Sequence, residues 1–304
     1  MLDYIRLMRP SQWIKNVVVL FGPAFSLHLL DARVPFVFAA FCLIASASYV
    51  LNDLADREAD KVHPVKKNRP LASGAVSPAG AAVLSLVLLV SGIAISHFWL
   101  PQLVTYILLS YFVLIQGYSF LLKKQPIIDV IIIAMGFVLR AVAGAQAVAV
   151  LVSPWLIACT FTLCMFLGFG KRRCELVTLG NKADAEAHRA TLLRYTPELL
   201  SHLISVSAGI AIMTFLLYVM DFNPRIPHPP FAKELLLYTL PLVAYAMFRY
   251  AMLTEMGRYS GPMQIIKKDV PLLVTGLVWI LVVAVIVLKT RADVVVTSVT
   301  GGGG

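Results

Sequence analysis

Nine apolar stretches, each long enough to cross a lipid bilayer, constrain this chain more than any other feature. Most of them hold about 18–22 residues, the length that about 30 Å of hydrocarbon requires in a helix. Hydrophobic residues make up 59% of the sequence and charged residues only 14%, a composition that a soluble fold could not bury. We therefore expect an all-α, polytopic membrane protein with one integral membrane domain over residues 1–304. The stretches are Trp13–Leu30, Val34–Leu51, Ala79–Trp99, Leu103–Leu122, Ile127–Leu151, Trp155–Gly170, Leu203–Met220, Leu235–Leu253 and Val270–Leu288.

The distribution of Lys and Arg predicts the orientation. Of the 26 cations, 20 fall in the N-terminus and in every second connection, 5 fall on the other side, and Arg140 lies within the fifth stretch. The positive-inside rule places the larger group in the cytoplasm, together with a cap formed by the 52–78 and 171–198 connections. Topology then explains the net charge of +10, and we expect no nucleic-acid partner. The terminal run Gly301–Gly304 is left out of this interpretation.

An acidic segment follows the second stretch and reads Asn52-Asp53-Leu54-Ala55-Asp56-Arg57-Glu58-Ala59-Asp60. If the helix continues, Asp53, Asp56 and Asp60 share one face and Glu58 points away from it. Like charges repel at this spacing, and a divalent cation would turn that repulsion into binding. Ligands that are all oxygen favour Mg²⁺ shared with a phosphorylated substrate. A solvated helix end is the alternative, but three aspartates beside an asparagine favour the metal site.

Two basic segments are candidate phosphate sites. In the loop after the acidic segment, Lys66 accompanies Arg69, whose guanidinium suits bidentate contact with phosphate. His63 in the same loop is expected to be a turn residue before Pro64. At the end of the sixth stretch, the spacing of Lys171 and Arg172 to Glu175 places all three on one helical face.

An arginine within a membrane span is costly and usually faces a polar cavity, so Arg140 is a further candidate. Asp129 lies eleven residues earlier on the same face, about 16 Å along the axis, so the two are expected to line one cavity without pairing. We expect this cavity to lie centrally and to open to the cytoplasm. Other polar residues expected at the same level are Lys15, Asn16, Lys123 and Lys124.

The pattern Asn52-Asp53-x-x-Asp56-x-x-x-Asp60 after the second span resembles the first aspartate motif of the UbiA prenyltransferase superfamily, and the similarity covers essentially the whole chain. The superfamily's second DxxxD motif is replaced here by Lys171-Arg172-x-x-Glu175-Leu176. The further segments Gln12-Trp13-Ile14-Lys15-Asn16, His63-Pro64-x-Lys66-x-x-Arg69-Pro70 and Gly136–Ala141 are similar to the decaprenyl-phosphate phosphoribosyltransferase branch.

This resemblance implies that 5-phosphoribosyl 1-diphosphate reacts with a polyprenyl phosphate and releases diphosphate, on the way to decaprenyl-phosphoryl-arabinose for cell-wall arabinan. It implies Mg²⁺ as cofactor and an active site on the cytoplasmic face of a bacterial plasma membrane. A homo-oligomer, such as a trimer, is compatible with the sequence. The expected catalytic residues are Asp53, Asp56, Asp60, Lys171 and Arg172, of which the aspartates also bind metal. The expected substrate-binding residues are Lys15, Asn16, Asn52, Lys66, Arg69, Lys123, Asp129, Arg140 and Glu175.

Two other functions stay open at this point. A prenyltransferase of the same superfamily would use prenyl diphosphate and an aromatic or lipid acceptor, but the missing second DxxxD motif disfavours it. A transporter would also use an intramembrane arginine, but should carry polar residues toward both membrane faces. The connections on the outer side are short or rich in proline, which favours a cavity closed at that end.

Overall fold

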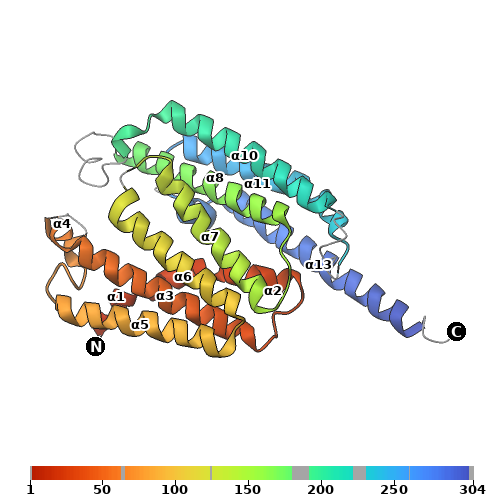
Figure 1. Ribbon diagram of the computed structural model, residues 1–304. Helices are drawn as coiled ribbons and strands as arrows, with labels where there is room; N and C mark the ends of the chain where they lie inside the picture. Colours follow the sequence, from red (N-terminus) through yellow and green to blue (C-terminus); the bar gives the residue numbers. More distant parts are fainter. Residues whose placement is uncertain are drawn as a thin grey trace. The chain divides into compact units, whose positions relative to one another are not determined.

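The computed structural model describes residues 2–62, 66–123, 125–179, 192–221, 231–259 and 261–300, and every regular element in these ranges is helical. The described residues form two compact units (Figure 1). The first unit contains residues 2–24 and 28–150, and the second contains residues 25–27, 151–179 and 192–300. The single domain over the whole chain stays a prediction.

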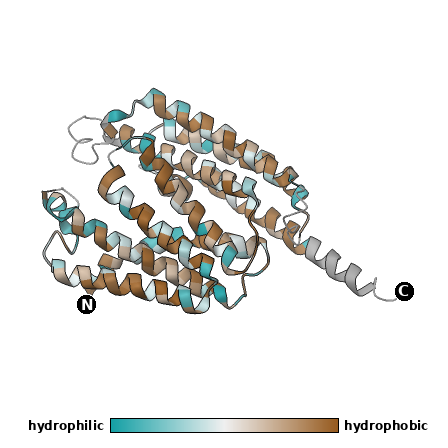
Figure 2. Cartoon of the chain, viewed as in Figure 1, coloured by the Kyte–Doolittle hydropathy of each residue, from teal (hydrophilic) through white to brown (hydrophobic). Residues whose placement is uncertain are grey.

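Eight helical segments are long and apolar enough to cross a membrane within the described ranges. They match the second to ninth predicted stretches, which confirms the all-α, multi-pass membrane fold. Apolar residues dominate these helices, as Figure 2 shows. The segments are α3 (Arg33–Ala55), α5 (Pro78–Trp99), α6 (Gln102–Gly117) continued by the π-helix η3 (Tyr118–Leu122), α7 (Ile128–Ala147), α8 (Pro154–Leu179), α10 (Pro197–Met220), the 3₁₀-helix η5 (Lys233–Thr239) continued by α11 (Leu240–Glu255), and α13 (Val270–Thr300).

The first predicted stretch, Trp13–Leu30, is not one continuous helix. It contains most of the 3₁₀-helix η1 (Pro10–Leu20) and the short helix α2 (Phe21–Phe25). A 3₁₀-helix rises about 2.0 Å per residue and an α-helix about 1.5 Å, so the two elements together extend about 30 Å, close to the thickness of the hydrocarbon core. The extended rise therefore gives this segment enough length to span, and the total of nine spans stays a prediction.

In the first unit, α3 packs along α5 and also contacts α6, α7 and η1. Glycines permit the closest approaches: a Cβ on Gly144 of α7 would lie 1.7 Å from the carbonyl oxygen of Val19 in η1, and one on Gly92 would lie 2.7 Å from Ile44. Small residues of this kind let helix backbones pack tightly in membranes. The packing holds η1 against the polar face of α7. The unit also contains α1 (Leu2–Met8), α4 (Arg57–Val62) and the short 3₁₀-helix η2 (Lys66–Asn68).

In the second unit, α8 and α10 lie side by side along their length (Figure 1). The hydroxyl of Thr196 accepts a hydrogen bond from the Leu199 amide and caps α10. Asp269 caps α13 in the same way, because its carboxylate accepts from the Leu272 amide at 2.9 Å. The guanidinium of Arg249 also binds Asp269 through two nitrogens, at 2.7 and 2.9 Å. The smaller elements are η4 (Leu192–Arg194) and α12 (Pro262–Lys268).

Candidate functional site

Three aspartates lie where α3 gives way to α4. Asp53 is in the last turn of α3, Asp56 joins the two helices with φ −90° and ψ 2°, and Asp60 is in α4. The amide of Asp60 donates to the Asp56 carbonyl at 2.8 Å, so the helical path is nearly continuous across the join. Asp53 and Asp60 are 2% and 3% exposed. Two carboxylates this deeply buried require compensating charges.

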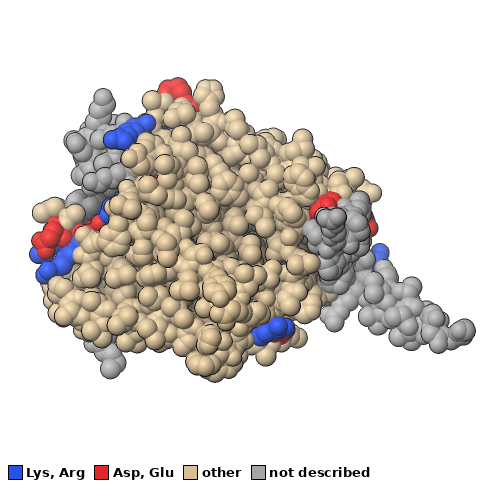
Figure 3. All heavy atoms as spheres, in the orientation of Figure 1, with Lys and Arg blue, Asp and Glu red and all other residues tan. Residues whose placement is uncertain are grey.

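Arginines supply most of that compensation. One nitrogen of Arg69, Nη1, donates to Asp53 at 2.9 Å and to Asp60 at 2.7 Å. Arg9 donates to the same Oδ1 of Asp53 at 2.5 Å, and Lys66 Nζ lies 3.9 Å from Asp60. On the face drawn in Figure 3, charged side chains gather over α4 while the long helices show few. The structure thus brings together the acidic segment and the basic loop of the first unit.

Asp56 is bound separately from the other two aspartates. Its carboxylate pairs with Lys123 and accepts a hydrogen bond from the Asn52 amide at 3.3 Å. Lys123 directly follows the π-helix η3, and the chain then makes a γ-turn at Ile127, where φ is 67° and the Ile128 amide donates to the Pro126 carbonyl. Short π-helical turns are frequent at functional sites, and strained backbone such as positive φ at a branched residue clusters there. Lys124 and His63 lie outside the described residues.

The donor set fits Mg²⁺ in its chemistry. Mg²⁺ takes carboxylate oxygens at about 2.0–2.1 Å, and Asp53 and Asp60 offer two that already converge on one cationic nitrogen. That nitrogen, Arg69 Nη1, stands where a metal ion shared by the two carboxylates would bind. As they stand, no three acidic, histidine or cysteine side chains in the described ranges are grouped closely enough to hold a metal ion. Binding would therefore require the arginine to move.

Glu58 lies apart from this cluster, as its spacing predicts. Its side chain is 74% exposed and accepts two hydrogen bonds from Lys61, at 2.8 and 2.9 Å. These bonds lower the pKa of Glu58 below its usual value. The residue is a solvated charge on the outer face of α4.

Arg140 is buried within α7, only 4% exposed, and bound by neutral groups. Its guanidinium donates to Asn16 at 2.8 Å, to the Gly136 carbonyl at 2.8 Å and to the Tyr111 hydroxyl at 2.7 Å. Its Cζ also lies 4.6 Å from the centre of the Tyr111 ring and 5.9 Å from that of Phe41. Within the described parts of the chain, no carboxylate lies within ion-pair distance of this guanidinium, so no acidic side chain described there neutralises its positive charge.

The other residues expected near this level differ in exposure. Asn16 is 1% exposed and joins Arg140 to Cys42, whose sulfur lies 3.3 Å from the Asn16 amide nitrogen. Lys15, which directly precedes Asn16 in η1, is exposed. Asp129 is fully buried in the first turn of α7. The expected cavity shared by Asp129 and Arg140 stays a prediction.

The second unit contains the other basic segment, at the C-terminal part of α8. Glu175 pairs with Arg172, and it lies 3.6 Å from Lys171, as the helical spacing predicts. Arg172 is 1% exposed, whereas the side chain of Lys171 is half exposed. The neighbouring Arg173 donates to Glu255 of α11 at 2.8 Å. This segment therefore combines a buried guanidinium with an accessible ammonium group.

Three further polar residues were not expected from the sequence. In the sequence, Arg9 is one of the orienting charges at the N-terminus, and Tyr111 lies inside an apolar span. The third is Gln116 of α6, whose amide oxygen and nitrogen are both buried without a hydrogen-bond partner in the structure as described. A buried, unsatisfied amide is costly, which makes Gln116 a candidate contact for a hydroxyl or phosphate group. A glutamine near the end of a span was the only available signal.

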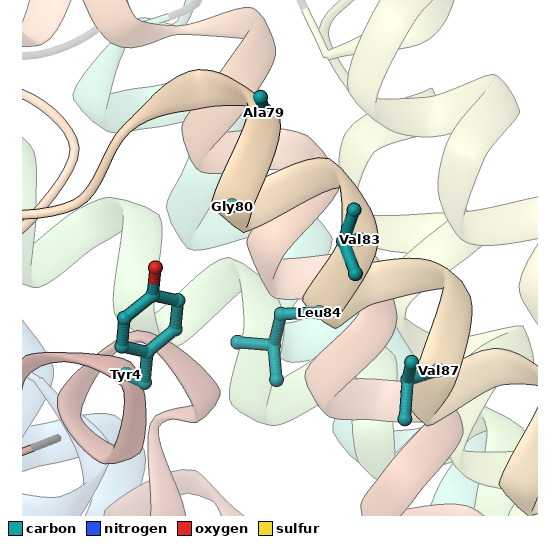
Figure 4. Close-up of a pocket in the computed structure, with 6 residues that line it drawn as sticks. All are labelled: Tyr4, Ala79, Gly80, Val83, Leu84 and Val87. Carbon is teal, nitrogen blue, oxygen red and sulfur yellow. The ribbon is translucent and has the colours of Figure 1, made fainter.

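An apolar groove of about 450 Å³ lies between α1 and α5 (Figure 4). Tyr4 contributes from α1, and the remaining lining residues are Ala79, Gly80, Val83, Leu84 and Val87 of α5. The groove contains none of the charged residues described above. Its lining offers no group for acid–base or phosphate chemistry, so it is not the candidate site.

Residues 17–266 match the model of the UbiA prenyltransferase family. The chain is 31% identical to a decaprenyl-phosphate phosphoribosyltransferase of Corynebacterium glutamicum, an alignment that covers 91% of this chain and 84% of that protein. It is 30% identical to the enzyme of the same name from Mycobacterium tuberculosis, over 91% of each chain.

Among solved structures, a UbiA homologue from Archaeoglobus fulgidus bound to GPP and Mg²⁺ has the same fold, with a TM-score of 0.69 at 18% identity. That similarity covers 95% of this chain and 99% of the other. The matched family model, the relatives and the shared fold agree, and this chain belongs to the UbiA prenyltransferase family.

Proposed function

We propose that this protein transfers a 5-phosphoribosyl group from 5-phosphoribosyl 1-diphosphate to a polyprenyl phosphate and releases diphosphate. The single observation that carries the proposal is the identity of about 30% to decaprenyl-phosphate phosphoribosyltransferases over 91% of the chain. The charge pattern supports it. The first unit has one aspartate cluster, and the segment at the end of α8 has Lys171 and Arg172 in place of aspartates.

This charge pattern suits a soluble donor with three phosphate groups and a lipid that carries one phosphate. Asp53, Asp56 and Asp60 would hold Mg²⁺, which when bound neutralises charge on the leaving diphosphate. The diphosphate is bound by Lys66, Arg69 and Lys123, and a ribose hydroxyl is bound by Asn52. We assign Lys171 and Arg172 to a phosphate group, with Glu175 fixing the Arg172 side chain.

In the reaction we propose, an oxygen of the lipid phosphate attacks C1 of the ribose with inversion. The C1–O bond to diphosphate breaks, and the diphosphate leaves with the electron pair. Because the attacking phosphate is already anionic, no general base is required. Catalysis then consists of positioning and of stabilising the charge that moves to the leaving group. The uncompensated charge of Arg140, held by Asn16, would attract the lipid phosphate or the donor phosphate.

We propose that the reaction takes place on the cytoplasmic side of a bacterial plasma membrane, because most of the cations are expected on that side. Its product would be a precursor of decaprenyl-phosphoryl-arabinose for cell-wall arabinan. A homo-oligomer is compatible with this arrangement.

The test is turnover by the purified protein with radiolabelled phosphoribosyl diphosphate and decaprenyl phosphate, with and without Mg²⁺. We expect radiolabel to enter the lipid phase with release of one diphosphate for each ribosyl group. Consumption of prenyl diphosphate with an aromatic acceptor, and none of phosphoribosyl diphosphate, would reject the proposal in favour of an ordinary prenyltransferase.

A further inference from the structure

The negative charge of the aspartate cluster in the first unit is fully compensated by basic side chains without a metal ion. The three carboxylates pair with four cations from three segments of the chain: Arg9, Lys66 with Arg69, and Lys123, of which Lys66 is the most distant at 3.9 Å. A divalent cation added to this cluster would give it an excess of positive charge. An anion such as diphosphate that binds together with the metal would neutralise this excess.

The geometry shows which groups compete with a metal. Arg9 and Arg69 both donate to Asp53 Oδ1, and Arg69 Nη1 also donates to Asp60 Oδ2. These two carboxylate oxygens can be no farther apart than 5.6 Å, the limit set by their distances of 2.9 and 2.7 Å to the shared nitrogen. A metal ion bound by both oxygens would take the place of that nitrogen. Metal and arginine therefore exclude each other there.

The backbone conformation and partial exposure of Arg9 suit such an exchange. Its backbone is left-handed, with φ 54° and ψ 59°, at the junction between α1 and η1. This conformation is uncommon for residues other than glycine and is concentrated at functional sites. The guanidinium is partly exposed and also lies 5.5 Å from the centre of the Tyr49 ring, whereas its partner Asp53 is buried. The arginine can therefore turn to another anion while the carboxylate stays in place.

We infer that Arg9 and Arg69 are exchangeable ligands, which bind Asp53 and Asp60 in the absence of metal and bind the donor diphosphate once a divalent cation has taken their place. The inference rests on the proposed function and adds Arg9 to its phosphate-binding residues. It requires that metal and diphosphate each strengthen the binding of the other. Coupling of this kind is typically 5–150-fold and is reciprocal.

The experiment measures Mn²⁺ binding by electron paramagnetic resonance in detergent, with and without methylenediphosphonate, after calibration for the complex formed by these two in solution. For the wild type we expect the diphosphonate to lower the apparent Kd for Mn²⁺ by about 5–150-fold. For Arg9→Gln we expect tighter binding of Mn²⁺ alone, because a competitor is gone, and a roughly tenfold smaller enhancement, within that same range of couplings. Arg9→Lys, which keeps the charge, should give an intermediate enhancement and serves if the glutamine variant does not fold.

The matched control is Arg6→Gln, which removes an equal charge from an exposed arginine that pairs with Asp3. It should behave as the wild type. An enhancement in Arg9→Gln equal to that of the wild type, or weaker binding of Mn²⁺ alone, would overturn the exchange.

Turnover of phosphoribosyl diphosphate by the same preparations separates this inference from the proposed function. Turnover with unaltered coupling in Arg9→Gln rejects the exchange alone. Coupled binding without turnover in the wild type rejects the proposed function alone.

Discussion

Replacing Arg140 by methionine should weaken substrate binding, and the protein should still fold. The change takes away the donors to Asn16 and Tyr111, and an unsatisfied buried acceptor costs about 1–3 kcal/mol. The Gly136 carbonyl keeps its place in the helix and loses little. In the other direction, removing a guanidinium from a membrane span gains about 2.5–3.5 kcal/mol on insertion scales. The loss from two such acceptors and this gain oppose each other, so the free energy of unfolding should change by no more than about 3.5 kcal/mol.

The functional effect can be measured separately from the effect on stability, because KM is a property of the folded protein. Losing one charged hydrogen bond to phosphate costs about 1.5–3 kcal/mol, which corresponds to a rise of roughly 10–150-fold in KM for the donor or the lipid phosphate. The assay is steady-state kinetics with both substrates, together with thermal unfolding followed by tryptophan fluorescence. Tyr111→Phe is the matched control, since it removes one hydrogen bond and retains the buried charge.

Two results would refute this reasoning about Arg140. A well-folded Arg140→Met protein with unchanged KM values would show that the buried charge attracts no substrate. A protein that unfolds although Tyr111→Phe is stable would show that the arginine is needed to hold α6, α7 and η1 together.

Three more outcomes are expected. Asp60→Asn should reduce turnover by about 100-fold or more, the size of losing one preorganised electrostatic contact, while Glu58→Gln, on the exposed face, should retain near wild-type kcat and KM. Gln116→Met should unfold at the same or a higher temperature, because no described partner is lost, yet raise the KM for one substrate; an unchanged KM would mean that Gln116 binds none. Asp269→Asn should lower the melting temperature at pH 7, and the difference from the wild type should shrink in scans taken below about pH 4.

The pH dependence of the last variant follows from the direction of the shift. Hydrogen bonds from the Arg249 side chain, and then from the Leu272 amide, hold the pKa of Asp269 below its usual value. A carboxylate with a depressed pKa stabilises the fold above its unfolded pKa and loses that contribution as the pH falls through the folded one. A difference that stays constant from pH 7 to pH 3 would contradict this origin.

Eight of the spans could be predicted from the sequence because a bilayer imposes one length and one composition on every helix. The first segment could not, because 3₁₀ and α-helices have the same apolar composition and differ only in hydrogen bonding. The spacing of Asp53 and Asp60 indicated their shared side of the chain, since it depends on local helical geometry alone. The partners of Arg140 were beyond reach, because Asn16 and Tyr111 meet it through packing between distant segments.

The contacts of Arg9 could not be predicted from the sequence for the same reason. Its role depends on a left-handed backbone and on a carboxylate 44 residues away. Neither is encoded in a local pattern, and in the sequence the residue is one cation among several that fit the positive-inside rule. Gln116 differs, because only the absence of partners in the folded chain distinguishes it from any glutamine at a helix end.

The close approach of Gly144 to Val19 has a consequence for a residue that neither of them touches. A Cβ on Gly144 would lie 1.7 Å from the Val19 carbonyl oxygen, so α7 and η1 meet backbone to backbone at this point. One turn away on the same two elements, Asn16 holds the guanidinium of Arg140. A methyl group at position 144 would push η1 away from α7. The side-chain amide of Asn16 would then move away from the Arg140 guanidinium. The environment of the buried Arg140 charge thus depends in part on position 144 being a glycine.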